Sequence, residues 1–160
     1  MTSVLFICLG NICRSPTAHG ILAHLISQHQ LSDRLQVDSA GTGAWHAGEA
    51  ADKRSQQTAN HHGITLDSRA RQITLDDLEH FDHILAMDQQ NFRSIAQLCT
   101  NSEHRRKLRL LRDLDPQSHP NSDTPDPYYG GPDGFEEVFQ ICWRSCQALI
   151  NELFPEVELL

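Results

Sequence analysis

Short apolar runs of strand length alternate along the chain with segments of helical spacing, and this alternation constrains the fold more than any other feature. The run VLFICL at 4–9 is continuously apolar, which is typical of a strand buried on both faces of a parallel sheet. Three more strands are predicted at 35–41, 81–87 and 107–112. Strands that alternate with helices predict an α/β fold with right-handed crossovers. We expect the 160 residues to form one domain, 1–160.

Four helices are predicted around these strands. The first has Ser15 as its N-cap and Pro16 at its first position. A polar helix is expected over 49–63, and a third helix begins after Asp88 as its cap. The last helix follows a loop at 113–133 and carries an apolar stripe, which consists of Phe135, Val138, Phe139, Cys142, Cys146, Leu149, Ile150 and Leu153.

The composition argues against several classes of function. The formal net charge is −8, from 13 Lys+Arg against 21 Asp+Glu, so the chain lacks the basic footprint of a general nucleic-acid binder. No apolar run approaches the roughly 18 residues that cross a bilayer, and no basic leader precedes the first strand. Five cysteines, an odd number, favour free thiols in a reducing cytoplasm. Ten histidines without an HExxH pattern favour surface positions and no metal site.

The first strand ends in the cluster CLGNICRS, in which Cys8 and Arg14 enclose five residues. In parallel sheets, ligands bind at the carboxyl ends of the strands, where this cluster lies. A loop that curls between strand and helix points successive backbone N–H groups inward, and the helix N-terminus adds its positive end. We therefore expect an anion site, whose substrate-binding residues are Leu9, Gly10, Asn11, Ile12, Cys13 and Ser15.

The residue types in this loop indicate phosphoryl transfer. Arg14 can grip two oxygens of a tetrahedral oxyanion, and the same donors should favour a thiolate at Cys8. Such a thiolate suggests in-line attack on phosphorus and a phosphocysteine intermediate. Ser15 can donate to the sulfur, while Asn11 suits a left-handed backbone conformation. The alternative is a buried strand cysteine beside a surface arginine.

Thiolate attack on a phosphate ester needs a general acid, and Asp126 in DPYYGG is the candidate. Pro127 favours an extended conformation at Asp126 and stiffens the loop. Tyr128 and Tyr129 could form an aromatic wall for a flat substrate, although a Pro/Gly turn with surface tyrosines is the alternative. Neither a GxxxxGK[ST] loop nor a complete GxGxxG pattern is present, which argues against two nucleotide-binding motifs.

These motifs resemble those of the low molecular weight protein tyrosine phosphatases. The resemblance covers nearly the whole chain and rests on VLFICLGNICRSPTA (4–18), DSAGTGAWHAG (38–48), ARQIT (70–74), FDHILAMD (81–88) and DPYYGG (126–131). It implies a three-layer α/β domain, with a four-stranded parallel sheet flanked by helices on both faces and no metal or organic cofactor. It also implies that Cys8 is the nucleophile, Arg14 the phosphate clamp and Asp126 the general acid and then the base.

The resemblance implies further roles. Trp45, Tyr128 and Tyr129 would form the rim that selects phosphotyrosine, and Asn11, Ser15 and Ser39 would hold the loop in shape. Cys13 would capture oxidised Cys8 as a reversible disulfide, with an apolar filler role as the alternative. Ser68 stands where several family members carry a histidine near the loop network.

The implied partners are phosphotyrosine proteins, a tyrosine kinase being one candidate, with inorganic phosphate as product. The protein would be a monomer or would self-associate weakly through Tyr128 and Tyr129. Two other functions compete with this interpretation. An arsenate reductase on the same fold needs a third mobile cysteine, for which Cys99 is the candidate. An inactive phosphotyrosine-binding module would be expected to have lost Cys8, Arg14 or Asp126, and all three are present.

Overall fold

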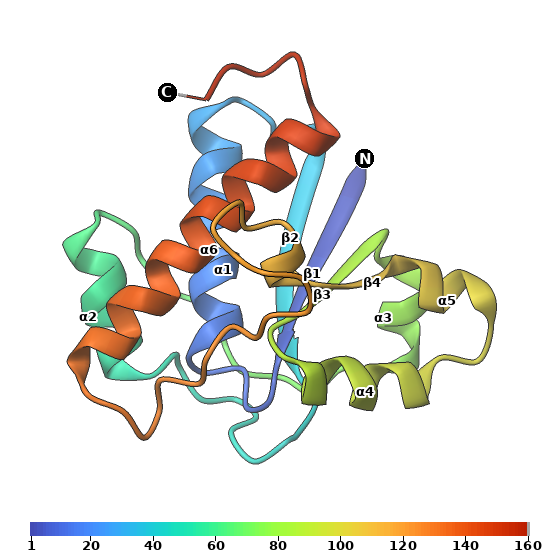
Figure 1. Ribbon diagram of the computed structural model, residues 1–160, viewed down its shortest axis with the longest axis horizontal. Coiled ribbons are helices and arrows are strands. Elements are labelled where there is room, and N and C mark those ends of the chain that lie inside the picture. The colour runs from blue at the N-terminus through green and yellow to red at the C-terminus, as the bar shows by residue number, and fades with distance from the viewer. Residues whose placement is uncertain (160) are drawn as a thin grey trace.

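The computed structural model describes residues 1–159 and contains a four-stranded parallel sheet (Figure 1). Its strands are β1 (Thr2–Cys8), β2 (Leu35–Gly41), β3 (His83–Ala86) and β4 (Leu108–Leu110). They lie in the order β2-β1-β3-β4, and all three pairings are parallel. The predicted parallel α/β sheet is therefore confirmed, and β2 has the predicted bounds.

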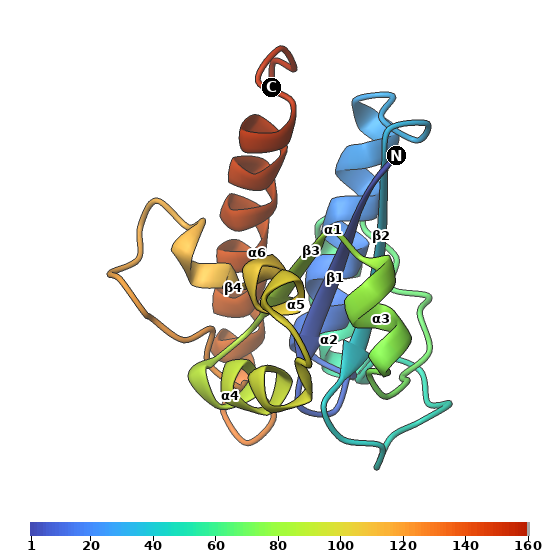
Figure 2. The same ribbon diagram turned by 90° about the vertical axis from the view of Figure 1, so that its right-hand side faces the viewer.

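Helices cover both faces of this sheet (Figures 1 and 2). On one face α1 (Arg14–Gln28) and α6 (Pro132–Leu153) pack together, with α2 (Lys53–His61) beside them; on the other side lie α3 (Leu75–His80), α4 (Gln89–Leu98) and α5 (Ser102–Lys107). Val4, Phe6 and Cys8 enter the core under α1 and α6, whereas Leu5 and Ile7 enter the core under α3 and α4. All five are buried, which confirms a three-layer fold around a central strand.

Helix α1 begins earlier than predicted. Its first residue is Arg14 and its N-cap is Cys13, so the expectation of Ser15 as N-cap and Pro16 as first residue is wrong. The hydroxyl of Ser15 lies against Cys8 and Asn11 and caps nothing. Pro16 is tolerated inside the first turn because a backbone N–H there would have no intrahelical partner.

The other helices follow local capping signals. Asp88 caps α4 as predicted, because its Oδ1 accepts from Asn91 N at 2.7 Å. The helix predicted at 49–63 is shorter, since Asp52 is its cap and the residues before it are irregular. Helices α3 and α5 were not predicted; they begin at the caps Thr74 and Asn101. A 3-10 turn, η1 (Leu111–Asp113), follows β4.

The strand order places the end of β1 at a special position. The chain passes from β1 to β2 on one side and then crosses to β3 on the other side of β1. In open parallel sheets, ligands bind at the carboxyl ends of strands where the winding reverses in this way. Cys8, the last residue of β1, lies at this point.

Among residues 1–159, no helix is both long and apolar enough to cross a membrane.

Candidate active site

The loop from Cys8 to Arg14 joins the buried strand to α1 and leaves its backbone donors unused. Asn11 has φ 56°, the left-handed conformation predicted for it. Within residues 1–159, the backbone N–H groups of residues 10–15 donate to no protein acceptor. Thr42 N and Gly43 N donate to the carbonyls of Cys8 and Leu9, both at 2.9 Å, which fixes the outside of the loop. The loop is therefore held from outside while its N–H groups remain available to an anion.

The sulfur of Cys8 has a defined hydrogen-bond partner. Cys8 is 3% exposed, and its Sγ lies 3.0 Å from Ser15 Oγ. Asn11 Nδ2 donates to the same Ser15 oxygen at 2.7 Å. The Ser15 hydroxyl has one hydrogen to donate, and the sulfur at 3.0 Å is a nearer acceptor than the Ala40 carbonyl at 3.5 Å. This arrangement places a hydroxyl group in hydrogen-bond contact with the sulfur.

Arg14 is held from behind by two acceptors. Its Nη1 donates to Asp88 Oδ2 at 2.7 Å and to the Thr124 carbonyl at 3.0 Å. Its Nη2 lies 3.7 Å from Asp126 Oδ2. Burial opposes the charged form, but Cys8 and Asp88 outweigh it, so the pKa of Arg14 is raised. Asp88 is a site residue that sequence reasoning missed, since only its role as helix cap was recognised.

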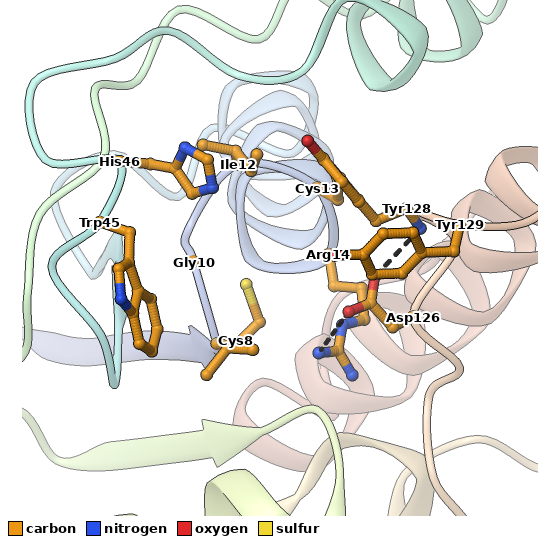
Figure 3. A pocket seen from close by; sticks show the side chains of 11 residues that line it. Cys8, Gly10, Ile12, Cys13, Arg14, Trp45, His46, Asp126, Tyr128 and Tyr129 are labelled. Atoms are coloured by element: carbon orange, nitrogen blue, oxygen red, sulfur yellow. Dashed lines mark hydrogen bonds and ion pairs between the residues drawn. The ribbon is translucent and has the colours of Figure 1, made fainter.

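Asp126 reaches the same place from a distant part of the chain, as Figure 3 shows. It belongs to the segment that precedes α6, and its carboxylate is 42% exposed. Its Oδ1 accepts a hydrogen bond from Tyr128 N at 3.1 Å, and this bond closes the turn at DPYY. The structure thus brings together the three predicted catalytic residues, Cys8, Arg14 and Asp126.

These groups open into one cavity of about 160 Å³. Figure 3 shows Trp45 on one side of Cys8, with Asp126 and the two tyrosines on the other. The residues that line the cavity are Cys8, Leu9, Gly10, Ile12, Cys13, Arg14, Trp45, His46, Asp126, Tyr128 and Tyr129. Of the residues predicted to bind substrate, Asn11 and Ser15 are not among those that line the cavity. His46 was not predicted; it follows Trp45, and its ring packs close to Gly10.

The rim of the cavity is aromatic and exposed. Trp45 is 72% exposed and its ring lies over Gly43, where an added Cβ would come within 1.8 Å of it. The rings of Tyr128 and Tyr129 meet edge-on at 4.9 Å, and Tyr129 is 92% exposed. An apolar ring entering the cavity would therefore pass between these aromatic side chains.

The loop is supported on the side away from the cavity. Asn11 Oδ1 accepts from Arg71 N at 3.0 Å, and the Arg71 guanidinium binds Asp38 and Asp77. Asn11 therefore joins the loop to the segment between β2 and α3.

Ser39 does not support the loop directly. It lies inside β2, and its Oγ is 3.0 Å from His19 Nδ1 on α1. Burial lowers the pKa of His19, which favours the neutral ring as partner of Ser39. Ser68 lines a separate groove beside His19. The expected contact of Ser39 with the loop is therefore replaced by a bond to α1.

All five cysteines are free thiols, and their surroundings differ. Burial is the main cause and the negative charge of Asp52 the second cause that raise the pKa of Cys13 to about 12. Burial also raises the pKa of Cys142 and of Cys146. These two residues of α6 lie in the core, as the apolar stripe of the last helix predicted. Cys99 donates to the Ile95 carbonyl at the end of α4 and lies outside the cavity.

The fold and the site together define an α/β protein with a cysteine–arginine loop suited to a tetrahedral anion. The family model described as low molecular weight phosphotyrosine protein phosphatase matches residues 3–159. The chain is 40% identical to the pig protein of that name over 152 residues, 94% of this chain and 95% of that protein. It therefore belongs to the low molecular weight phosphotyrosine protein phosphatase family, as predicted. Proteins of this family are hydrolases that act on phosphoric monoesters.

Solved structures agree with this assignment. A protein tyrosine phosphatase from Entamoeba histolytica, with Hepes in its active site, superposes with a TM-score of 0.92 at 35% identity, covering 98% of this chain and 99% of that chain. A Drosophila arginine phosphatase superposes with a TM-score of 0.88 at 32% identity, covering 96% and 98% of the two chains. The fold is thus shared by one structure named a tyrosine phosphatase and another named an arginine phosphatase.

Proposed function

We propose that this protein hydrolyses aryl phosphate monoesters, above all phosphotyrosine in proteins, through a phosphocysteine intermediate on Cys8. The observation that carries the proposal is the convergence of Cys8, Arg14 and Asp126 on one cavity, around a loop whose N–H groups have no protein acceptor within residues 1–159. A phosphate group in this loop would accept from those N–H groups and from Arg14. Its aryl group would extend between Trp45 and the tyrosines.

In the first step, the Cys8 thiolate attacks phosphorus opposite the ester oxygen. The S–P bond forms as the P–O bond to the aryl group breaks, and Asp126 donates its proton to the departing oxygen. Arg14 and the loop N–H groups stabilise the charge on the three equatorial oxygens. Because Asp88 and Thr124 fix one nitrogen of Arg14, its guanidinium is oriented before substrate arrives.

In the second step, water attacks the phosphocysteine and phosphate leaves. Asp126, now a carboxylate, accepts a proton from that water as its oxygen bonds to phosphorus. The S–P bond breaks, and the sulfur departs as a thiolate that the Ser15 hydroxyl stabilises. The products are inorganic phosphate and the starting enzyme, so no cofactor is required.

The cavity favours a phosphorylated tyrosine over a phosphorylated arginine. Asp126 is the one carboxylate among the residues that line it, and it must be protonated in the first step. The lining therefore offers a guanidinium leaving group no carboxylate besides that acid, whereas the apolar ring of a phenol packs against the aromatic rim. A phosphoserine side chain is too short to place its phosphate on Cys8 while its backbone remains outside the rim.

The finer features of this activity are also proposals. We infer phosphotyrosine proteins as substrates, a tyrosine kinase among the candidates, and a reducing cytoplasm as the compartment, because all five cysteines are free. An oxidised Cys8 sulfenic acid could condense with the Cys13 thiol to a disulfide and water, which a cellular thiol would reverse. The exposed ring of Tyr129 offers a surface for weak self-association.

Turnover of p-nitrophenyl phosphate and of a phosphotyrosine peptide tests the proposal. The Cys8→Ser substitution should lower turnover by on the order of 10³-fold or more. The Asp126→Ala substitution should slow hydrolysis of the phosphotyrosine peptide more than that of p-nitrophenyl phosphate. Cys99→Ser, which changes a thiol outside the cavity, is the matched control and should keep full activity. Full activity in Cys8→Ser, or an inert wild type that reduces arsenate with thioredoxin, contradicts the proposal. Parallel phosphoserine and phosphoarginine peptides should be poor substrates.

A further inference from the structure

The segment that carries the proposed acid, residues 125–130, receives few hydrogen bonds from the rest of the protein, although Pro127 within it is buried and Thr124 just before it is bonded to Met87 and Arg14. Within residues 125–130, Tyr128 N bonds to Asp126 and Gly130 N bonds to Pro127 O, both inside the segment. In the described chain, one hydrogen bond enters this segment from elsewhere: Arg54 Nη1 donates to the Tyr128 carbonyl at 3.0 Å. The 3.7 Å contact between Arg14 and Asp126 is an ion pair and is longer than a hydrogen bond.

Arg54 is itself firmly oriented. It is the second residue of α2, and its Nε and Nη2 donate to the two oxygens of Asp52 at 3.1 and 2.9 Å. Its guanidinium lies 4.7 Å from the ring centroid of Phe135 and 5.2 Å from that of Tyr128. A planar fork with a bidentate carboxylate and two ring faces has little rotational freedom.

The same contacts reach the phosphate loop. Asp52 N donates to the Ile12 carbonyl at 2.8 Å, so the residue that grips Arg54 is bonded to the loop that holds Cys8. A continuous series of hydrogen bonds therefore runs from Ile12 through Asp52 and Arg54 to Tyr128, and from Tyr128 N to Asp126. Arg54 is bound to a carboxylate and lies outside the cavity lining, which argues against a role in binding the phosphate itself.

We propose that Arg54 is a positioning residue for the general acid, setting the place of Asp126 relative to the phosphate loop. The inference rests on the proposed function, because it assigns Arg54 to the protonation of the leaving group. Loss of Arg54 leaves Tyr128 O without its donor, so residues 126–130 can shift about the buried Pro127 and the bonded Thr124. A displacement of about 1 Å can slow a reaction by about a hundredfold, so even a small shift is measurable.

The leaving group separates this role from a general loosening of the site. A tyrosine phenolate is basic and needs the proton from Asp126, whereas p-nitrophenolate departs more readily without it. For Arg54→Met, which keeps the apolar stem against the rings, kcat/KM should fall about tenfold or more for phosphotyrosine and only about twofold for p-nitrophenyl phosphate. Arg54→Lys keeps the charge near the rings and should recover part of the loss.

Two controls complete the experiment. Arg106→Met removes an exposed arginine of α5 that pairs with Glu103, and it should leave both substrates unaffected. In the Asp126→Ala background, Arg54→Met should cause little further loss, because a positioning residue has nothing left to position. Unfolding in urea verifies that each variant is folded; the Arg54 side chain is 44% exposed, so we expect folded protein.

Each outcome decides the inference. An equal loss for both substrates, no loss at all, or full additivity with Asp126→Ala overturns it. If the wild type fails to hydrolyse phosphotyrosine, the proposed function falls instead. If the wild type and Asp126→Ala behave as proposed while Arg54→Met keeps the wild-type ratio of substrates, only the role of Arg54 is wrong.

Discussion

Replacing Asp88 tests how the phosphate clamp is held. Its two oxygens do different work: Oδ1 caps α4 through Asn91 N, and Oδ2 binds Arg14, a side chain that is 3% exposed. Asp88→Ala removes both interactions at once, leaving Arg14 buried with the Thr124 carbonyl and the more distant Asp126. We therefore expect a loss of stability and a loss of activity from a single substitution.

The expected loss of stability combines two contributions. Losing an N-cap costs about 1 kcal/mol. Removing one partner of a buried ion pair costs about 3–5 kcal/mol, and the lower end applies because Asp88 is 19% exposed and Thr124 remains as an acceptor. The sum, about 4 kcal/mol, is a large part of the roughly 5–15 kcal/mol of a typical domain. Asn101→Ala, which removes the cap of α5 far from the site, should cost only about 1 kcal/mol.

Urea unfolding and steady-state kinetics provide the two measurements. With a slope of about 2 kcal/mol/M, the midpoint of Asp88→Ala should fall about 2 M below wild type. A less well oriented Arg14 should lower kcat/KM for p-nitrophenyl phosphate about 10- to 100-fold. Asp88→Asn should keep much of the cap, because asparagine caps as well as aspartate, yet still lose activity. If Asp88→Ala loses no more stability than Asn101→Ala and keeps its kcat/KM, the Arg14–Asp88 pair does not hold the clamp.

Two further predictions concern the rim and the core. Gly43→Ala places a Cβ 1.8 Å from the Trp45 ring and should displace it, raising KM for a phosphotyrosine peptide about 2- to 12-fold at unchanged kcat; an unchanged KM would show that Trp45 does not contact the substrate. The second prediction concerns Asp115. Burial alone would raise the pKa of Asp115, but its ion pairs with Arg144 and Arg112 hold that pKa below its usual value. Asp115 thus stabilises the fold above its unfolded-state pKa and loses that effect as pH falls through its folded value. Asp115→Asn should cost about 3 kcal/mol at pH 7, with the difference from wild type narrowing below about pH 4 in urea titrations; a difference independent of pH contradicts the pairing.

The sequence was sufficient wherever one local pattern decides the structure. A continuous apolar run placed β1, strand-length segments with fewer apolar residues placed the other three strands, and one carboxylate before a helical stretch placed the start of α4. Helices α3 and α5 were missed because six residues are too few to show an apolar stripe, although the capping box of Thr74 and Asp77 marks one of them.

The errors in predicting the site have a common cause: several of its side chains bind partners that are distant in the sequence. Ser15 suits a helix cap by type, but Asn11 and Cys8 engage its hydroxyl instead. The bond from Arg14 to Asp88 spans 74 residues, and the bond from Arg54 to Tyr128 also spans 74. No spacing rule in a single sequence shows such pairs, so the residues that position the chemistry were harder to find than those proposed to perform it.

The start of α1 without a side-chain cap has a consequence for the energetics of the whole protein. In the described part of the chain, several N–H donors of this loop have no protein acceptor, and a tetrahedral anion in the loop would satisfy them. The unfolded chain offers no comparable place, so binding there is coupled to folding. Phosphate at a hundred times its dissociation constant would add about 2.7 kcal/mol to the free energy of unfolding. The ion released by the proposed reaction would then serve as a ligand of the native state, and thermal stability would rise as product accumulates.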